Sequence, residues 1–127
     1  MASSPGFAAT PRCAIAQIST ANTLRDGTGT IGTVFTAGAS GSRIENVTIA
    51  ATGTTTAGMV RLFVHNGTTA YLLQEIPVYA ITPSSTVSSF YAYVQFENGL
   101  IIPTSYSLRA STNNAETFNV IAQGGDF

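Results

Sequence analysis

The side chains that could do catalytic or metal chemistry are few in this chain, and they are widely spaced. It has one histidine, His65, one cysteine, Cys13, no lysine, and six carboxylates that are separated along the sequence. A general base needs an orienting carboxylate and a nucleophile within about 3 Å, and a metal site needs several converging ligands. His65 directly precedes an Asn-Gly dipeptide, so we interpret it as a solvated turn residue. We therefore expect no enzymatic activity, no metal and no cofactor.

Two further features suggest chemistry but have simpler interpretations. Residues 27–32, GTGTIG, match the pattern G-x-G-x-x-G, which cradles a phosphate only where a helix follows. The next residues, 33–36, have the composition of a strand, so we interpret the motif as a Gly/Thr-rich loop. Because Cys13 is the only cysteine, it cannot form an intrachain disulfide, and we expect it to be a small buried hydrophobic residue.

The composition is unusual for its low charge. Only 9% of the residues are charged, against roughly a quarter in most soluble domains, and Thr, Ser and Gly stand in their place. A surface with so little charge repels its neighbours weakly, which suits a protein that lies against other protein. The formal net charge is −1 and the five arginines are scattered, so we expect no direct nucleic-acid partner.

No stretch of the chain has the character of a membrane or export segment. No apolar run approaches the roughly 18 residues of a membrane span. The first eleven residues have neither the basic nor the apolar region of a secretory signal. We therefore expect no membrane partner and synthesis in a cytosol.

The length and the periodicity predict one β domain. We expect residues 13–127 to form a single all-β domain, an antiparallel β-sandwich or jelly roll of about eight strands, because short segments alternate with period two and are separated by turn residues. Residues 1–12 are small and aperiodic, and we expect them to form an N-terminal arm held by a neighbouring subunit. The expected strands are residues 13–18, 31–36, 43–51, 59–65, 71–78, 90–96, 106–111 and 117–122.

Turn residues indicate how these strands connect. Asn66-Gly67 predicts a hairpin between 59–65 and 71–78, and Asn98-Gly99 predicts a turn that leads into 100–102. Pro77 lacks a backbone donor, so we expect its strand at a sheet edge or at a bulge.

The alternation also predicts which side chains face outward. Val60, Leu62 and Val64 are expected in the core, and the intervening Arg61, Phe63 and His65 on the outside. By the same logic Phe90, Ala92, Val94 and Phe96 face inward, Tyr91 and Tyr93 outward, and Ser107, Arg109 and Ser111 outward. Exposed aromatic and arginine side chains commonly anchor protein interfaces. The candidate interface residues are Arg12, Arg61, Phe63, Tyr91, Tyr93 and Arg109.

Three stretches of the sequence resemble a known class of viral proteins. They are TIGTVFTAGASGSRIENVTIAATGTTTAGMVRLFVHNGTT (residues 30–69), LLQEIPV (72–78) and SYSLRASTNNAETFNVIAQGGDF (105–127). They resemble capsid cement or decoration proteins of tailed bacteriophages. The resemblance implies a homo-oligomer, a dimer or trimer, on the outside of the virion, which binds across subunits of the major capsid protein and stabilises the shell.

A second function stays open on the sequence alone. Tyrosine pairs such as Tyr91 and Tyr93 stack on sugar rings as well as on protein. The same fold could therefore serve as a carbohydrate-binding or receptor-binding β-sandwich of a phage tail, fibre or baseplate.

Overall fold

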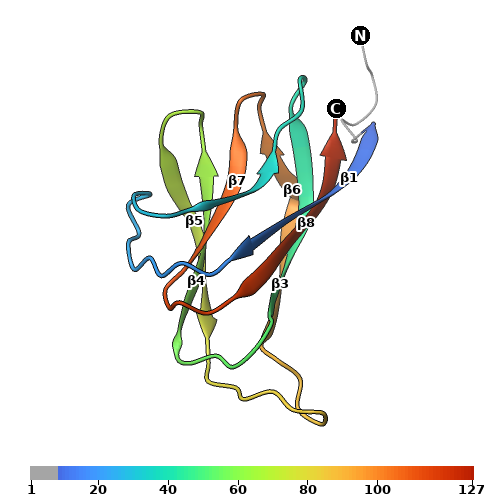
Figure 1. The fold of residues 1–127 in the computed structure, drawn as a ribbon. Helices are drawn as coiled ribbons and strands as arrows, with labels where there is room; N and C mark the ends of the chain where they lie inside the picture. The colour runs from blue at the N-terminus through green and yellow to red at the C-terminus, as the bar shows by residue number, and fades with distance from the viewer. Residues whose placement is uncertain (1–8) are drawn as a thin grey trace.

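The alternating sequence forms eight β-strands, and the computed structural model describes residues 9–127 (Figure 1). The strands are β1 Thr10–Ile18, β2 Gly32–Thr36, β3 Ser42–Ala51, β4 Gly58–His65, β5 Ala70–Val78, β6 Tyr91–Ile102, β7 Ser107–Thr112 and β8 Phe118–Asp126. Residues 1–8 of the expected arm lie outside the described residues, whereas Thr10 to Arg12 belong to β1. Within residues 9–127, no helix is long and apolar enough to cross a membrane.

The strands pack as two antiparallel sheets in the jelly-roll order. Sheet A has the order β1-β8-β3-β6 and sheet B the order β2-β7-β4-β5. Among the strands of residues 9–127, only β4 and β5 are joined by a hairpin within one sheet, and each other connection crosses to the opposite sheet (Figure 1). The structure confirms the predicted all-β sandwich of eight strands.

The core lies between the two sheets and is built mainly from Phe, Ile, Leu and Val. Phe90 packs edge-to-face on Phe118, with ring centroids 6.1 Å apart, and on Tyr79 at 5.3 Å. Burial of one such side chain contributes about 1.5–3 kcal/mol. Phe90 and Val94 are buried and Tyr91 between them is exposed, so the inward and outward faces of this segment are as predicted.

The β4–β5 hairpin and the position of Pro77 also match the sequence prediction. Asn66 Oδ1 accepts hydrogen bonds from the backbone amides of Thr68 and Thr69, at 3.0 and 2.8 Å, and Gly67 has a φ of 96°. Strand β5, which contains Pro77, is an edge strand of sheet B. The missing amide of Pro77 therefore leaves the sheet interior intact.

The predicted turn at Asn98-Gly99 is wrong. Both residues have left-handed φ values, 63° and 78°, but β6 runs through them to Ile102. In the pairing with β3, Gln95 stands opposite Asn46 and Leu100 opposite Ile44, so residues 96–99 bulge out beside the single residue Glu45. Residues with left-handed φ values occur in β-bulges as well as in turns. Here β6 stays paired with β3 on both sides of these residues, so they form a bulge.

The outer face of sheet B is covered, which contradicts several outward predictions. The connection between β1 and β2, residues 19–31, crosses this face: the Asn22 amide bonds the Thr112 carbonyl at 2.8 Å, and Gly27 lies against the Ala70 carbonyl. The side chains of the face that are buried instead of exposed are Arg61, Phe63, Ser107 and Ser111.

Candidate functional site

The outer face of sheet A is the broad open surface of the sandwich. The strand register places side chains in rows that run across β1, β8, β3 and β6. The rows are Gln17-Asn119-Ala50-Tyr91, Ile15-Ile121-Thr48-Tyr93 and Cys13-Gln123-Asn46-Gln95. We call these twelve residues the sheet A face.

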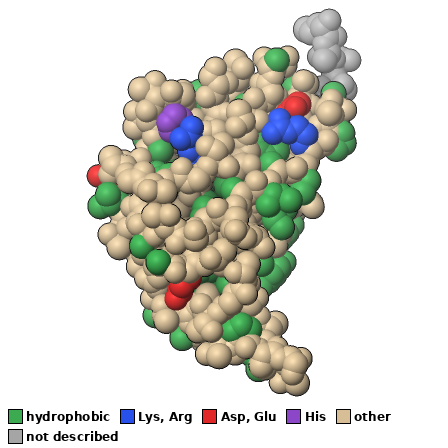
Figure 2. All heavy atoms as spheres, in the orientation of Figure 1, with side chains coloured by type: hydrophobic (Ala, Val, Ile, Leu, Met, Phe, Trp, Pro, Cys, Tyr) green, Lys and Arg blue, Asp and Glu red, His purple; other side chains and the backbone are tan. Residues whose placement is uncertain are grey.

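The sheet A face is uncharged and partly apolar. Ile15, Tyr91 and Tyr93 are 66%, 59% and 50% exposed, and none of the twelve residues is Asp, Glu, Arg or His. Figure 2, which views the sandwich from the side, shows hydrophobic side chains in the region of β1 and β8. Aromatic and aliphatic side chains without charges are typical of the centre of protein interfaces.

The size of the sheet A face limits what it can bind alone. With strands about 4.8 Å apart and successive outward residues about 6.8 Å apart, four strands and three rows span about 400 Å² in projection. A stable pairwise interface buries about 800 Å² on each partner. The sheet A face alone is therefore at the small end of protein interfaces.

One end of the sheet A face is marked by the bulge and by charges. Beside Pro11, Cys13 and Gln123 lies an open hollow of about 450 Å³, which Glu45 and Asn46 border on the other side. Glu45 is paired with a neighbouring arginine of β3 at 2.7 Å. The charged side chains of Arg43 and Glu45 thus lie at the bulge, beyond the uncharged sheet A face.

Tyr91 and Tyr93 are the two predicted interface residues that lie on the sheet A face. They stand on β6 opposite Ala50 and Thr48, and both are exposed. The structure places them together, and the role we assign to them stays a prediction.

Arg12 lies near the same face but is engaged at the edge of the sandwich. Its guanidinium donates to Asp126 Oδ1 at 2.9 Å and to the Thr36 carbonyl at 2.9 Å, and it lies 4.1 Å from the centre of the Phe35 ring. The hydroxyl of Ser42 and the Arg12 guanidinium lower the pKa of Asp126. Arg12 therefore ties β1 to β2 and β8.

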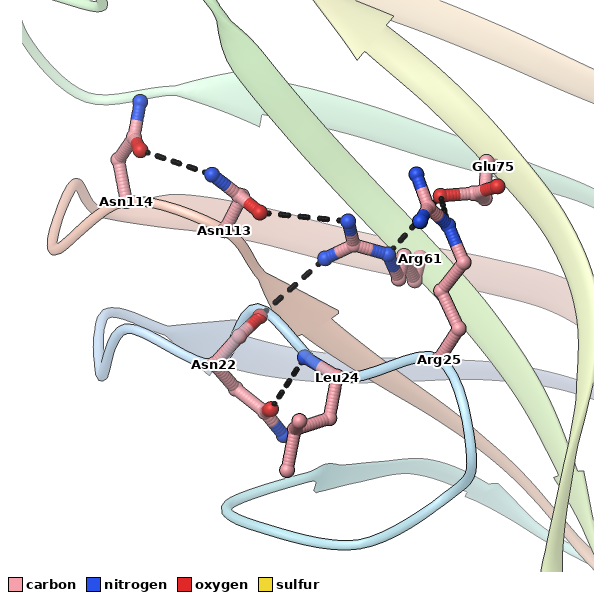
Figure 3. Close-up of polar contacts among 7 residues, drawn as sticks. All are labelled: Asn22, Leu24, Arg25, Arg61, Glu75, Asn113 and Asn114. Atoms are coloured by element: carbon pink, nitrogen blue, oxygen red, sulfur yellow. Dashed lines mark hydrogen bonds and ion pairs between the residues drawn. The ribbon is translucent and has the colours of Figure 1, made fainter.

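Arg61 is buried, so the prediction that it faces outward is wrong. Its side chain is 3% exposed and donates to Glu75 Oε2 at 2.9 Å, to the Asn22 carbonyl at 3.2 Å and to Asn113 Oδ1 at 3.2 Å (Figure 3). Arg25 donates to the same Glu75 oxygen at 2.7 Å. Hydrogen bonds from Arg25 and then from Arg61 lower the pKa of Glu75. The network holds the 19–31 connection on sheet B.

Phe63 and Arg109 also lie on the sheet B side. Phe63 is fully buried, so its predicted exposure is wrong as well. Arg109 is half-buried and lines a pocket with His65. Of the six predicted interface residues, the two tyrosines thus share the sheet A face, Arg12 lies at the edge of the sandwich, and the other three lie on the sheet B side.

Sequence reasoning missed the aliphatic part of the sheet A face and misplaced Cys13. Cys13 is exposed, in contrast to the prediction, and Ile15 next to it in β1 points the same way. The inward residues in the middle of β1 are the small Ala14 and Ala16, which pack against the core, and Ile18 at the end of the strand is buried in it. The sequence signal for this orientation was the alternation in β1 of Cys13, Ile15 and Gln17 with the alanines between them. The small alanines face inward because β1 is an edge strand, where little space separates it from the core.

Among residues 9–127, no three His, Cys, Asp or Glu side chains come together in a way that could hold a metal ion. The one histidine is bonded locally: His65 Nδ1 accepts from the Gly67 amide at 3.1 Å.

Comparison with known proteins relates the chain to others through its fold. No protein-family model matches the sequence, and no curated protein sequence is significantly similar to it. The structure is similar to a chain in a solved structure described as the cyanophage Pam1 capsid asymmetric unit, with a TM-score of 0.50 and 16% sequence identity. The alignment covers 100% of this chain and 92% of that chain. At this identity the similarity extends to the fold alone.

Proposed function

We propose that this protein is a structural component of a bacteriophage virion that decorates the outside of the capsid. In this role it binds across neighbouring major capsid protein subunits, as a dimer or trimer, and has no catalytic activity. The sheet A face is the contact surface. The observation that carries the proposal is this open, uncharged face with exposed Ile15, Tyr91 and Tyr93 on an otherwise charge-poor sandwich.

Two further observations support the proposal. A chain of nearly the same length with a similar fold occurs in a cyanophage capsid asymmetric unit. The sequence segments 30–69, 72–78 and 105–127 resemble phage decoration proteins.

The small area of the sheet A face fits a repeated lattice better than a single tight complex. A face of about 400 Å² gives weak binding per copy. Copies that associate with each other bind a lattice with much higher avidity, because the second contact is intramolecular. A ligand that binds only the assembled shell stabilises that state by mass action.

The test is co-sedimentation of the purified protein with phage heads that lack it. We expect the wild-type protein to sediment with the heads and to raise the temperature at which they open. Tyr93→Glu places a charge in the middle of the sheet A face and should abolish binding. Ser85→Glu is the matched control, because Ser85 is exposed in the β5–β6 connection, and it should bind like the wild type.

Alkylation of Cys13 gives an independent readout of the surface, because Cys13 lies in the third row of the sheet A face. We expect a maleimide to react with it in the free protein and to be excluded on heads. Wild-type protein that remains in the supernatant and leaves the heads unchanged contradicts the function. Binding that tolerates Tyr93→Glu and leaves Cys13 reactive contradicts the surface.

A further inference from the structure

Arg109 differs from the other arginines in its surroundings within residues 9–127. Four arginines each have a carboxylate oxygen at 2.7–2.9 Å: Arg12, Arg25, Arg43 and Arg61. Arg109 has none within 4.0 Å in that part of the chain, and its one side-chain hydrogen bond there runs from Nε to Ser107 Oγ at 3.0 Å. The two terminal nitrogens of a guanidinium carry four further donors in a planar fork that fits a carboxylate. A half-buried cation of this kind is equipped to receive an anion from outside.

Arg109 borders a pocket of about 290 Å³. The pocket lies between the Gly/Thr-rich segment 26–31 and the β4–β5 hairpin, and Figure 2 shows a histidine beside an arginine on this side of the molecule. Because His65 Nδ1 already accepts from the Gly67 amide, Nε2 is the ring nitrogen that can bond a ligand. Asp26 and the hydroxyl-bearing residues Thr28, Thr68 and Thr69 complete the polar lining. Asp26 Oδ1 accepts hydrogen bonds from the amide and the hydroxyl of Thr28, at 3.1 and 2.6 Å.

The wall of the pocket is held in place before any ligand binds. Asn22 Nδ2 donates to the carbonyls of Thr28 and Thr30, at 2.9 and 3.0 Å. Gly27 has a φ of 86° and packs so closely on the Ala70 carbonyl that a Cβ atom would lie 2.2 Å from that oxygen. A site whose wall is fixed in advance loses little freedom on binding.

We propose that this pocket binds a carboxylate-bearing sugar, a residue of the hexuronic acid type in an acidic glycan. Arg109 takes the carboxylate, and the hydroxyl groups of the sugar bond to His65, to the threonines and to Asp26. A sugar is preferred over an acidic protein side chain because the rest of the polar lining consists of threonine hydroxyl groups, His65 and the carboxylate of Asp26. These groups match the hydroxyl groups of a sugar ring, whereas a simple acid leaves them without a ligand partner. The volume is at the small end of ligand pockets, about 300–1,000 Å³, so it accommodates one ring.

This inference goes beyond the proposed capsid role and does not depend on it. The pocket lies over sheet B, on the opposite side of the sandwich from the sheet A face. A molecule that used the sheet A face on a shell would present the pocket to the outside.

The test is an NMR titration of the full chain, labelled with ¹⁵N, with three probes. We expect methyl glucuronide to shift the amide resonances of Gly27, Thr68 and Arg109, with a dissociation constant of about 1 mM. Methyl glucoside lacks the carboxylate and acetate lacks the ring, and each should bind at least about tenfold more weakly. Equal binding of the glucoside, equal binding of acetate, or shifts confined to sheet A would overturn the proposal.

Variants assign the site to Arg109. Arg109→Gln should weaken glucuronide binding by about tenfold or more, and Arg109→Lys should weaken it less, because it keeps the charge but loses the planar fork. Arg43→Gln removes the same charge from sheet A and should bind like the wild type. If Arg109→Gln fails to fold, Arg109→Lys and Thr68→Val, which removes an exposed hydroxyl, carry the test. Unchanged affinity in these two folded variants overturns the proposal.

Discussion

Arg61 and Arg25 form a matched pair for measuring what burial adds to a hydrogen-bonded ion pair. Both donate from Nε to the same atom, Glu75 Oε2, at 2.9 and 2.7 Å. Their side chains are 3% and 59% exposed. Replacing either residue by methionine removes one positive charge, so the change in net charge is the same.

The two substitutions differ in the acceptors that they leave behind. Without Arg61, the Asn22 carbonyl and Asn113 Oδ1 each lose a donor, and an unsatisfied interior acceptor costs about 1–3 kcal/mol. Asn22 is buried and Asn113 is only partly buried, so we expect Arg61→Met to lower the free energy of unfolding by about 3 kcal/mol. In a domain of this size, that corresponds to about 10 °C in Tm. Arg25→Met breaks an exposed pair, and we expect its Tm to change by less than about 3 °C.

Far-UV circular dichroism is the suitable probe, since the chain has no tryptophan. Urea and thermal unfolding of the three proteins give the two differences, and equal m-values show that the unfolded states are comparable. If Arg61→Met is no more destabilising than Arg25→Met, water satisfies the abandoned acceptors, and the idea that this network holds the 19–31 connection is refuted.

Three further predictions follow from single residues. The pKa of Asp126 is lowered from its ordinary value of 3.8. The ionised carboxylate therefore stabilises the folded state fully above pH 3.8, and this contribution is lost as the pH falls through the lowered pKa of the folded state. Tm should accordingly drop below about pH 4, and it should drop less steeply in Asp126→Asn. Gly124→Ala should lower Tm strongly, because a Cβ atom there would lie 2.0 Å from the Arg43 carbonyl oxygen. Gly53→Ala is the control and should leave Tm nearly unchanged, because a Cβ atom at Gly53 has no other atom within 4 Å. Equal effects of the two substitutions on Tm would contradict this packing. Cys13 is exposed, so native protein should react with a thiol reagent as fast as urea-unfolded protein, and strong native protection in the monomer would show that β1 is misplaced.

The sequence predicted those parts of the fold that depend only on the residues of one strand or of one turn between two paired strands. Alternation in 90–96 separates buried Phe90 and Val94 from exposed Tyr91 and Tyr93, because sheet A has one covered face and one open face. Asn66-Gly67 predicted its hairpin because the two strands beside it pair directly.

The errors on β4 and β6 have one physical origin, which is a contact with a segment distant in sequence. Alternation distinguishes the two faces of β4, but it does not reveal that residues 19–31 bury the second face over Arg61 and Phe63. The backbone angles of Asn98-Gly99 fit a turn or a bulge, and only the pairing of β6 with β3 decides between them. Alternation alone thus predicted the exposed tyrosines of the sheet A face, whereas the strand register was needed to place Ile15 in the same row as Tyr93.

The strand order of sheet A has a consequence for synthesis on the ribosome. Strand β8, Phe118–Asp126, lies between β1 and β3, so β1 has no partner in its sheet until β8, which is made later, has left the exit tunnel. Until then, the edges of β1 and β3 that pair with β8 stay unpaired in the nascent chain. Unpaired strand edges and long-range pairing slow folding and promote association between incompletely synthesised chains. A product that stops short of residue 118 lacks the strand that joins β1 to the rest of its sheet, so truncated copies should be removed by proteolysis instead of entering an assembly.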